Sequence, residues 1–334
     1  MTPNPTVVFD TYWKFAAKRH HIYELRLAGA PQPWTNDPIL QTHKFTNCFR
    51  VADRVSQYLT REVIYNPYAS SDAEEAVFRI LLFKFFNSIT TWELLTAQFG
   101  IPTWKGFNET AYVQALDAAI TNRVKIWNAA YMQNDLSNYE HVSPKKHPRY
   151  LRLLKNMMST NVTGKLRAAR TYRDAFLVLY SYPLHKGFIG MQHLCDLNYS
   201  PVINFSEDDF IIPGPGALRG IQKCFAYGRQ PTVAEAVEVI EACVAGQEHY
   251  FAYLGLQPVT LFGRRLHAID CQNLFCEVDK YARVAHPQFN LKPGARIKQT
   301  LKPTGPLPKP FFPPKWGLQL PSLNGKGHSS RGGN

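Results

Sequence analysis

Apolar residues recur at helical spacing along most of this chain, and no stretch alternates apolar and polar residues for long enough to require a sheet. Terminal signals support the pattern, because Asp72 precedes one apolar run as an N-cap and Gly100 follows another. We therefore expect an all-α fold over residues 40–285. Helices are predicted at 45–59, 73–87, 91–99, 109–132, 150–160, 166–181, 232–245 and 267–284.

Length and proline content suggest the domain organisation. A chain of 334 residues has room for one large domain or two closely packed domains. We expect an N-terminal extension at 1–34, a helical domain at 35–286 and a basic, proline-rich strap with a disordered tail at 287–334.

The apolar run 78–86 contains two basic residues, so no membrane span is expected. Six cysteines are too few for a disulfide scaffold, which favours a reducing compartment.

The formal charge of +13 is concentrated in two segments. Residues 141–173 contain nine Lys or Arg and no acid, and residues 280–334 contain ten more and no acid. The rest of the chain is net acidic, so a polyanionic partner such as DNA is the simplest use of these segments. A solvated helix face is the alternative. Within the first run we expect DNA contacts from Lys145, Lys146, Arg149 and Arg152.

A Gly-Phe-Ile-Gly sequence follows the first basic run. Gly187 and Gly190 permit a tight turn with exposed amides between two helices. This is similar to helix–hairpin–helix DNA glycosylases, in which hairpin amides grip a phosphate and a catalytic aspartate follows about eighteen residues later. Asp208 and Asp209 lie at about that distance, and they are candidate catalytic residues. A plain turn followed by a helix cap explains the pattern almost as well.

Two further segments could bind anions. The Pro-Gly-Pro-Gly sequence at 213–216 precedes a segment that we expect to be helical, so Gly214, Gly216 and Arg219 form a candidate phosphate site. An ordinary loop is the alternative, and the chain has no Gly-x-x-x-x-Gly-Lys-Ser/Thr P-loop. Basic residues also lie beside aromatic ones in the helices predicted at 45–59 and 73–87, where they could hold phosphate or pair with acids: Arg50, Arg54 and Arg79.

The helix predicted at 267–284 carries a polar stripe. Asn273, Glu277 and Lys280 are three or four residues apart, so they share one face. A carboxylate, an amide and a lysine in one place could position an amine and take its proton, and Glu277 is the preferred candidate base. A surface face with helix ion pairs is the alternative. No cysteine or histidine pair has zinc spacing, and we predict no metal and no cofactor.

These segments together resemble one known family. The sequences at 45–58, 78–87, 187–197, 214–220 and 272–281 resemble the amino acid:DNA transferases of phage thymine hypermodification, also called alpha-glutamyl/putrescinyl thymine pyrophosphorylases. Their helical domain is shared with 5-hydroxymethyl-deoxyuridine DNA kinases. The resemblance covers about residues 35–285.

The resemblance implies a helix–hairpin–helix glycosylase-like fold that performs a different reaction. The 5-(pyro)phosphomethyl group of a modified deoxyuridine in phage DNA would lose its (pyro)phosphate to the amine of an amino acid or polyamine, with glycine preferred over glutamate and putrescine. The modified DNA would be protected from restriction in the cytoplasm of the infected bacterium. Expected partners are DNA containing 5-phosphomethyluracil, a free amino acid or polyamine, and functionally a 5-hydroxymethyl-deoxyuridine DNA kinase.

Two alternatives remain open at this point. A helix–hairpin–helix DNA base glycosylase would use Asp208 or Asp209 to stabilise the developing sugar cation. A non-catalytic DNA-binding partner of such a kinase would bind DNA and leave its mass unchanged.

Overall fold

The computed structural model describes residues 3–128, 136, 143–302, 305 and 307–320. These residues form helices and connecting segments, with isolated β-bridges and no strand, so the predicted all-α class is confirmed. None of the helices in these ranges is long and apolar enough to cross a membrane. The α-helices are α1 (Val7–Leu27), α2 (Pro38–Thr42), α3 (Arg54–Tyr58), α4 (Ala73–Phe86), α5 (Ile89–Phe99), α6 (Glu109–Thr121), α7 (Lys146–Ser159), α8 (Val162–Ala168), α9 (Tyr172–Tyr180), α10 (Phe188–Asn198), α11 (Pro215–Cys224), α12 (Val233–Tyr253) and α13 (Ala268–Ala285).

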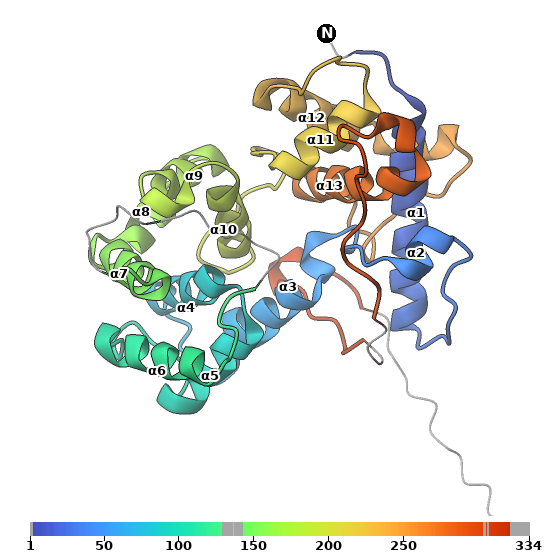
Figure 1. Ribbon diagram of the computed structural model, residues 1–334. Coiled ribbons are helices and arrows are strands. Elements are labelled where there is room, and N and C mark those ends of the chain that lie inside the picture. Colours follow the sequence, from blue (N-terminus) through green and yellow to red (C-terminus); the bar gives the residue numbers. More distant parts are fainter. Residues whose placement is uncertain (1–2, 129–135, 137–142, 303–304, 306, 321–334) are drawn as a thin grey trace, which may run out of the picture.

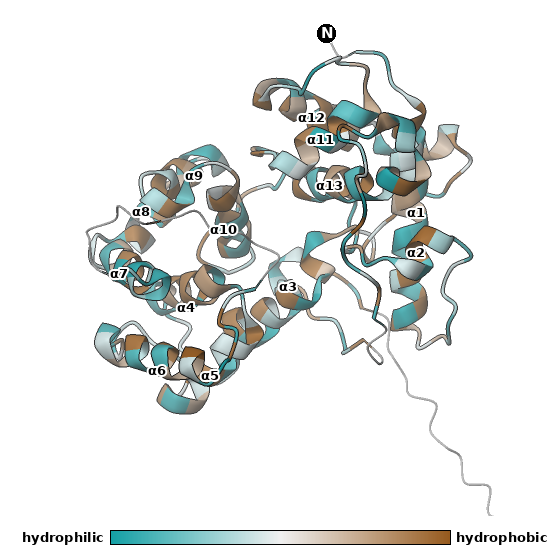
Figure 2. Ribbon diagram, viewed as in Figure 1, coloured by the Kyte–Doolittle hydropathy of each residue, from teal (hydrophilic) through white to brown (hydrophobic). Residues whose placement is uncertain are grey.

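The helices gather into two lobes, with α3 between them (Figure 1). We call α4 to α10 the first lobe, and α1, α2 and α11 to α13 the second lobe. The chain therefore starts in the second lobe, builds the first and returns. Both lobes combine apolar and hydrophilic residues along their helices (Figure 2), and the apolar side chains form one buried cluster.

Helix α1 lies within 1–34, the range expected to be an extension. It packs on α11 and α13, and its Tyr12 and Trp13 are completely buried. The helical fold thus begins before residue 35. Helix-spaced apolar residues at Val8, Tyr12 and Phe15 carried this signal in the sequence.

The helix predicted at 45–59 is interrupted. Residues 44–49 are not helical, a short turn covers Arg50–Ala52, and α3 begins only after Asp53. Backbone N–H groups here donate to side chains: that of Asn47 to Asp53 and that of Arg50 to Asp270. These carboxylates replace the carbonyls that a continuous helix would supply.

Other predicted boundaries also moved for local reasons. The helix expected at 166–181 is split into α8 and α9, because Thr171 and Asp174 form a capping box that starts a new helix. The helix expected at 109–132 ends at Thr121, before Arg123 adopts a positive φ. Helix α12 instead continues through Gly246 to Tyr253.

Two glycines allow α11 and α13 to approach closely. A Cβ on Gly216 would lie 2.4 Å from the Sγ of Cys276, and a Cβ on Gly220 would lie 2.0 Å from the carbonyl oxygen of Phe275. The glycines of the proposed anion segment are therefore needed for helix packing. Gly214 precedes them as the N-cap of α11.

A buried ion cluster joins residues 44–53, which we call the interlobe segment, to the first lobe. Arg50 donates through Nη1 and Nη2 to Asp196, at 2.7 and 2.9 Å, and Lys84 lies 3.0 Å from the same carboxylate. Arg50 also donates to Gln192, and all of these side chains are buried. Although burial alone would raise the pKa of Asp196, the two cations hold it below its ordinary value.

The proline-rich segment at 307–320, which we call the strap, packs on both lobes. Gln57 exchanges two hydrogen bonds with the backbone of Phe311, at 2.9 and 3.0 Å. Lys315 donates to the carbonyls of Ser200 and Ile203, while Trp316 lies under the guanidinium of Arg264 at 3.9 Å. Residues 321–334, the last part of the strap and disordered tail expected at 287–334, lie outside the described residues.

Gly220→Ala should destabilise the fold by about 2 kcal/mol or more, because the new methyl group collides with backbone and not with a flexible side chain. Urea denaturation measures this change. Gly246→Ala is the matched control: its Cβ would meet only the Tyr250 ring, at 3.1 Å, and better helix propensity favours it by up to about 1 kcal/mol. Equal stability of the two variants would contradict the packing argument.

Asp196→Asn should lower the free energy of unfolding by about 3–5 kcal/mol, because two buried cations, Arg50 and Lys84, would lose the carboxylate that they share. Denaturation against Arg229→Gln, which breaks an exposed pair with Glu235, provides the comparison. If Asp196→Asn and Arg229→Gln both unfolded at the same denaturant concentration as the parent chain, the ion cluster would not be needed for stability.

Candidate functional site

Two of the sequence segments that resemble the transferases meet between the lobes. The Oε2 atom of Glu277 on α13 accepts the backbone N–H of Thr46 at 3.1 Å and lies 2.6 Å from the Nζ of Lys280. Glu277 is 4% exposed, so the carboxylate of this ion pair is almost completely buried. The interlobe segment at 44–53 is thereby fixed on the polar stripe predicted for α13.

Asp53 is a second carboxylate at this junction. Its Oδ1 accepts the backbone N–H of Asn47 at 2.9 Å, and the Asn47 side chain accepts from Arg19 at 2.6 Å. Loss of water raises the pKa of Asp53 to about 6; Asn47 and Arg19 oppose this shift, and the charge of Glu277 adds to it. A carboxyl group with this pKa can accept a proton near neutral pH. We call Arg19, Asn47, Asp53, Glu277 and Lys280 the junction cluster.

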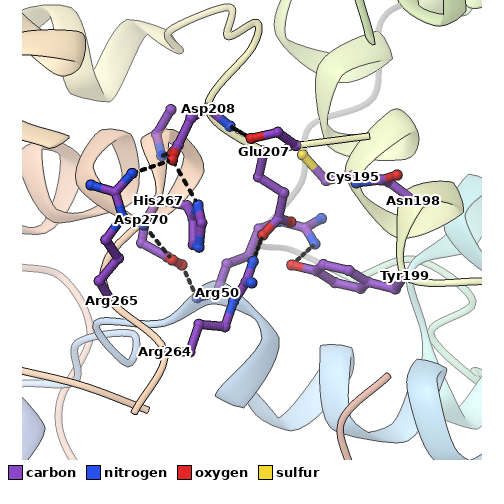
Figure 3. Close-up of polar contacts among 12 residues, drawn as sticks. Arg50, Cys195, Asn198, Tyr199, Glu207, Asp208, Arg264, Arg265, His267 and Asp270 are labelled. Carbon is purple, nitrogen blue, oxygen red and sulfur yellow. Dashed lines mark hydrogen bonds and ion pairs between the residues drawn. The ribbon is translucent and has the colours of Figure 1, made fainter. Parts of the chain in front are cut away.

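Asp270 lies at the start of α13 and contacts Arg50 (Figure 3). It is buried and accepts the backbone N–H groups of Arg50, at 2.8 Å, and His267, at 3.2 Å. Burial raises the pKa of Asp270 to about 6, and the nearby charge of Glu207 contributes. The bond from His267 caps α13, and the bond from Arg50 ties the interlobe segment to that helix.

The two candidate aspartates after the hairpin have different surroundings. Asp208 accepts the backbone N–H of Ala268 at 3.0 Å, pairs with Arg265 at 2.8 Å and lies 3.0 Å from His267 (Figure 3). These contacts outweigh burial and lower the pKa of Asp208. Asp208 therefore acts as an anchor for the start of α13. Asp209 is exposed and makes no side-chain hydrogen bond with the described residues.

The three candidate phosphate-binding arginines are not equivalent. Arg50 is enclosed by Asp196 and Gln192, and Arg79 is 1% exposed and donates to the carbonyls of Val63 and Ser70. Both guanidinium groups thus hold the protein's own segments together. Arg54 is exposed, directly follows Asp53, and has no ion-pair partner among the described residues.

The other candidate phosphate-binding residues line the contact of α11 with α13. Gly214 donates its N–H to Gln272 at 3.4 Å, and Gln272 in turn donates to the side chain of Asn273 at 2.9 Å. Arg219 lies 3.3 Å from Asp279. This arrangement links two motifs far apart in sequence, and it engages Arg219 within the protein.

Most of the expected DNA-binding residues on α7 have partners on α6 or nearby. Lys145 pairs with Asp117 at 2.7 Å, Arg152 pairs with Glu109 at 2.8 Å, and Lys146 lies over the Trp127 ring at 4.8 Å. Arg149 donates to the carbonyl of Ser143 at 2.6 Å. The acid-free run in sequence is thus partly neutralised in space.

The hairpin glycines lie at the start of α10. Gly187 has φ +64° and is the N-cap of α10, while Gly190 lies in its first turn. A Cβ on Gly190 would lie 1.9 Å from the carbonyl oxygen of His185, so the turn requires a glycine there. A tight turn between two helices is therefore present, and its use on DNA stays a prediction.

Sequence reasoning missed several residues of this region. Arg19 lies on α1, outside the range expected to be helical, and Asp53 is not among the candidate site residues of the sequence analysis. Asp196 and Lys84 were not singled out, although a lysine inside an apolar run is itself a signal for a buried partner.

A cleft of about 450 Å³ lies between α1, residues 260–262 and the strap. Tyr23, Phe262, Pro310 and Leu320 are among its mostly apolar lining residues. Burial raises the pKa of Tyr23, and the charge of Asp53 adds to that shift, so this wall of the cleft is close to the junction cluster. Its volume is within the range of small-molecule sites.

Within the parts of the chain that the structure describes, no group of three or more His, Cys, Asp or Glu side chains could hold a metal ion.

Comparison with known proteins gives one curated relative and one family. The 5-hmdU DNA kinase of Bacillus phage SP10 is 28% identical over 134 residues, which are 39% of this chain and 21% of that protein. The chain thus covers about a fifth of the length of this relative. No solved structure matches. A family model described as "5-hmdU DNA kinase, helical domain" matches residues 6–291 and therefore covers both lobes, from α1 to α13. The chain belongs to the family of 5-hmdU DNA kinase helical domains.

Proposed function

We propose that this protein replaces the phosphate or pyrophosphate of a 5-(pyro)phosphomethyl-deoxyuridine in phage DNA with the amine of an amino acid or polyamine. The observation that carries the proposal is the junction cluster. It brings two carboxylates and two cations from α1, the interlobe segment and α13 into one place beside a cleft. Membership of a family named for 5-hmdU DNA kinases supports modified DNA as the substrate.

The reaction needs a proton acceptor, an anion site and an accessible methylene carbon. The modified nucleobase must leave the stacked DNA helix to enter a protein site. The C–O bond between methylene and phosphate breaks and its electrons leave with the phosphate. A protein carboxylate takes a proton from the ammonium form of the amine, and the lone pair freed on nitrogen forms the new C–N bond. Cations that stabilise the departing charge lower the barrier.

Asp53 fits the role of the base better than Glu277. Glu277 pairs with Lys280 and accepts the backbone N–H of Thr46, so its carboxylate holds the junction together. Asp53 has a pKa of about 6, and one hydrogen bond to its carboxylate is formed by the described residues. Asp209 is exposed and remains a weaker alternative.

Arg54 is the strongest remaining candidate for the phosphate. It follows the proposed base directly and has no ion-pair partner among the described residues, whereas Arg50 and Arg79 are enclosed. Lys280, with 24% of its side chain exposed, can add a second positive charge or bind the carboxylate of an amino acid. Asn273 lies one helical turn before Glu277 and completes the polar face.

DNA carrying 5-phosphomethyl-deoxyuridine, incubated with glycine, glutamate or putrescine, should give a nucleoside that has lost phosphate and gained one of these amines. Mass spectrometry of the digested nucleosides detects the product, and DNA with unmodified thymidine is the control. Alkali-sensitive abasic sites would indicate a glycosylase, and an unchanged nucleoside mass with every amine would indicate a binding protein. Either result would contradict amine transfer.

The transfer rate of the parent chain should rise with pH through about 6 and then level, because Asp53 must be ionised to accept a proton. Asp53→Asn should lower the rate roughly a hundredfold or more and remove this pH dependence. Single-turnover assays from pH 5 to about 8 measure both effects.

Stability separates this role from a structural one. A raised folded-state pKa means that ionised Asp53 destabilises the fold, fully above about pH 6. Asp53→Asn should therefore melt higher than the parent chain at neutral pH, and the difference should vanish as pH falls toward the ordinary value of 3.8. Glu277→Gln is the comparison: it should melt lower because Lys280 loses its partner. If folded Asp53→Asn kept the parent chain's rise in transfer rate with pH, Asp53 would be excluded as the proton acceptor.

A further inference from the structure

The basic run at 141–173 has two halves that differ in their surroundings. On α7, Lys145, Arg152 and Lys155 lie against Asp117 or Glu109 of α6. Beyond α7, the cationic residues are exposed and have no ion-pair partner among the described residues; they are Lys165, Arg167, Arg170 and Arg173. The charge that remains free for a partner is thus on α8, α9 and the turn between them.

The turn that follows α9 adds to this surface. Lys186 is exposed and lies 5.9 Å from the Tyr180 ring centre, and Lys165 of α8 lies 6.0 Å from that of Tyr182. These contacts place cations from both sides of α9 next to its C-terminal end. The single acid on α9, Asp174, accepts the N–H of Thr171 in the helix cap.

Helix α9 also exposes apolar groups among these charges. Arg173, Leu177 and Tyr180 are spaced by four and three residues and so share one helix face. Leu177 is 50% exposed and Tyr180 is 43% exposed, which is unusual for large apolar side chains in this chain. An aromatic ring and a leucine among cations suit a surface that contacts sugars or bases as well as phosphates.

We propose that Lys165, Arg167, Arg170, Arg173 and Lys186, with Leu177 and Tyr180, form the surface that binds the backbone of DNA. We call it the α8–α9 surface. Cations in this arrangement bind by neutralising phosphates and releasing counterions, which requires no particular base sequence. The inference takes DNA as the partner from the proposed function, but it concerns binding and not amine transfer.

A salt titration with matched variants tests the α8–α9 surface. One variant carries R167Q, R170Q and R173Q; the control carries R149Q, R152Q and K155Q on α7. Both lose the same formal charge. Binding of the full chain to a fluorescent duplex of unmodified DNA is measured by anisotropy at several salt concentrations. Thermal melting of each variant accompanies the titration, because the substituted surface residues should leave the fold intact.

The α8–α9 variant should lose tenfold or more in affinity, and the slope of log K against log salt should fall by about 2–3. The α7 control should keep most of its affinity and most of its salt slope, because Arg152 and Lys155 pair with Glu109 of α6 and Arg149 donates to the Ser143 carbonyl. Equal losses in the two variants would mean that only net charge matters, and unchanged binding by the α8–α9 variant would mean that DNA lies elsewhere. Both results would overturn the inference.

This test is independent of the chemistry. Unmodified DNA and no amine are present, so absence of amine transfer by the parent chain would not affect its outcome. Conversely, an intact α8–α9 variant that binds normally would refute this surface and leave the proposed reaction to its own assay.

Discussion

The bidentate contact of Arg50 with Asp196 is the interaction on which the arrangement of this protein depends. Arg50 belongs to the segment between the lobes, while Asp196 is on α10 of the first lobe. Because both charges are out of water, either one without the other would carry a large desolvation cost. Lys84, Gln192 and Tyr199 complete the polar contacts. The backbone N–H of the same Arg50 donates to Asp270 at the start of α13, so this residue connects the first lobe to the second.

That constraint explains why the interlobe segment is not one helix. Its N–H groups at Thr46, Asn47 and Arg50 donate to Glu277, Asp53 and Asp270, respectively. Each carboxylate replaces a backbone acceptor, and two of them come from α13. The resulting extended course carries Asp53 beside Arg19 and leaves Arg54 exposed. The features of the candidate site are therefore consequences of how the chain satisfies its backbone between two lobes.

Charge has a different distribution in space from its distribution in sequence. The run at 141–173 contains no acid, yet α6 supplies Asp117 and Glu109 to its first part. Helix α6 precedes the run in the chain and packs on α7, and tertiary contact alone produces this neutralisation. Among the described residues of this run, the exposed cations without an ion-pair partner lie on α8, α9 and the turn between them. A basic segment is thus an insufficient description of a polyanion-binding surface, because local pairing decides which charges face a partner.

Helical periodicity determined the all-α class, because repeated burial of one helix face leaves a signal in a single sequence. Capping residues such as Asp72 also located several helix ends from sequence alone, and the polar stripe on α13 followed from helical spacing. Tertiary structure alone decided that Arg50 and Arg79 are enclosed, that Gly216 and Gly220 serve helix packing, and that Arg19 joins Asp53. These outcomes depend on partners far away in the chain. Sequence spacing fixes which residues share a helix face, but long-range packing fixes which of their charges lose water and which find a counter-charge.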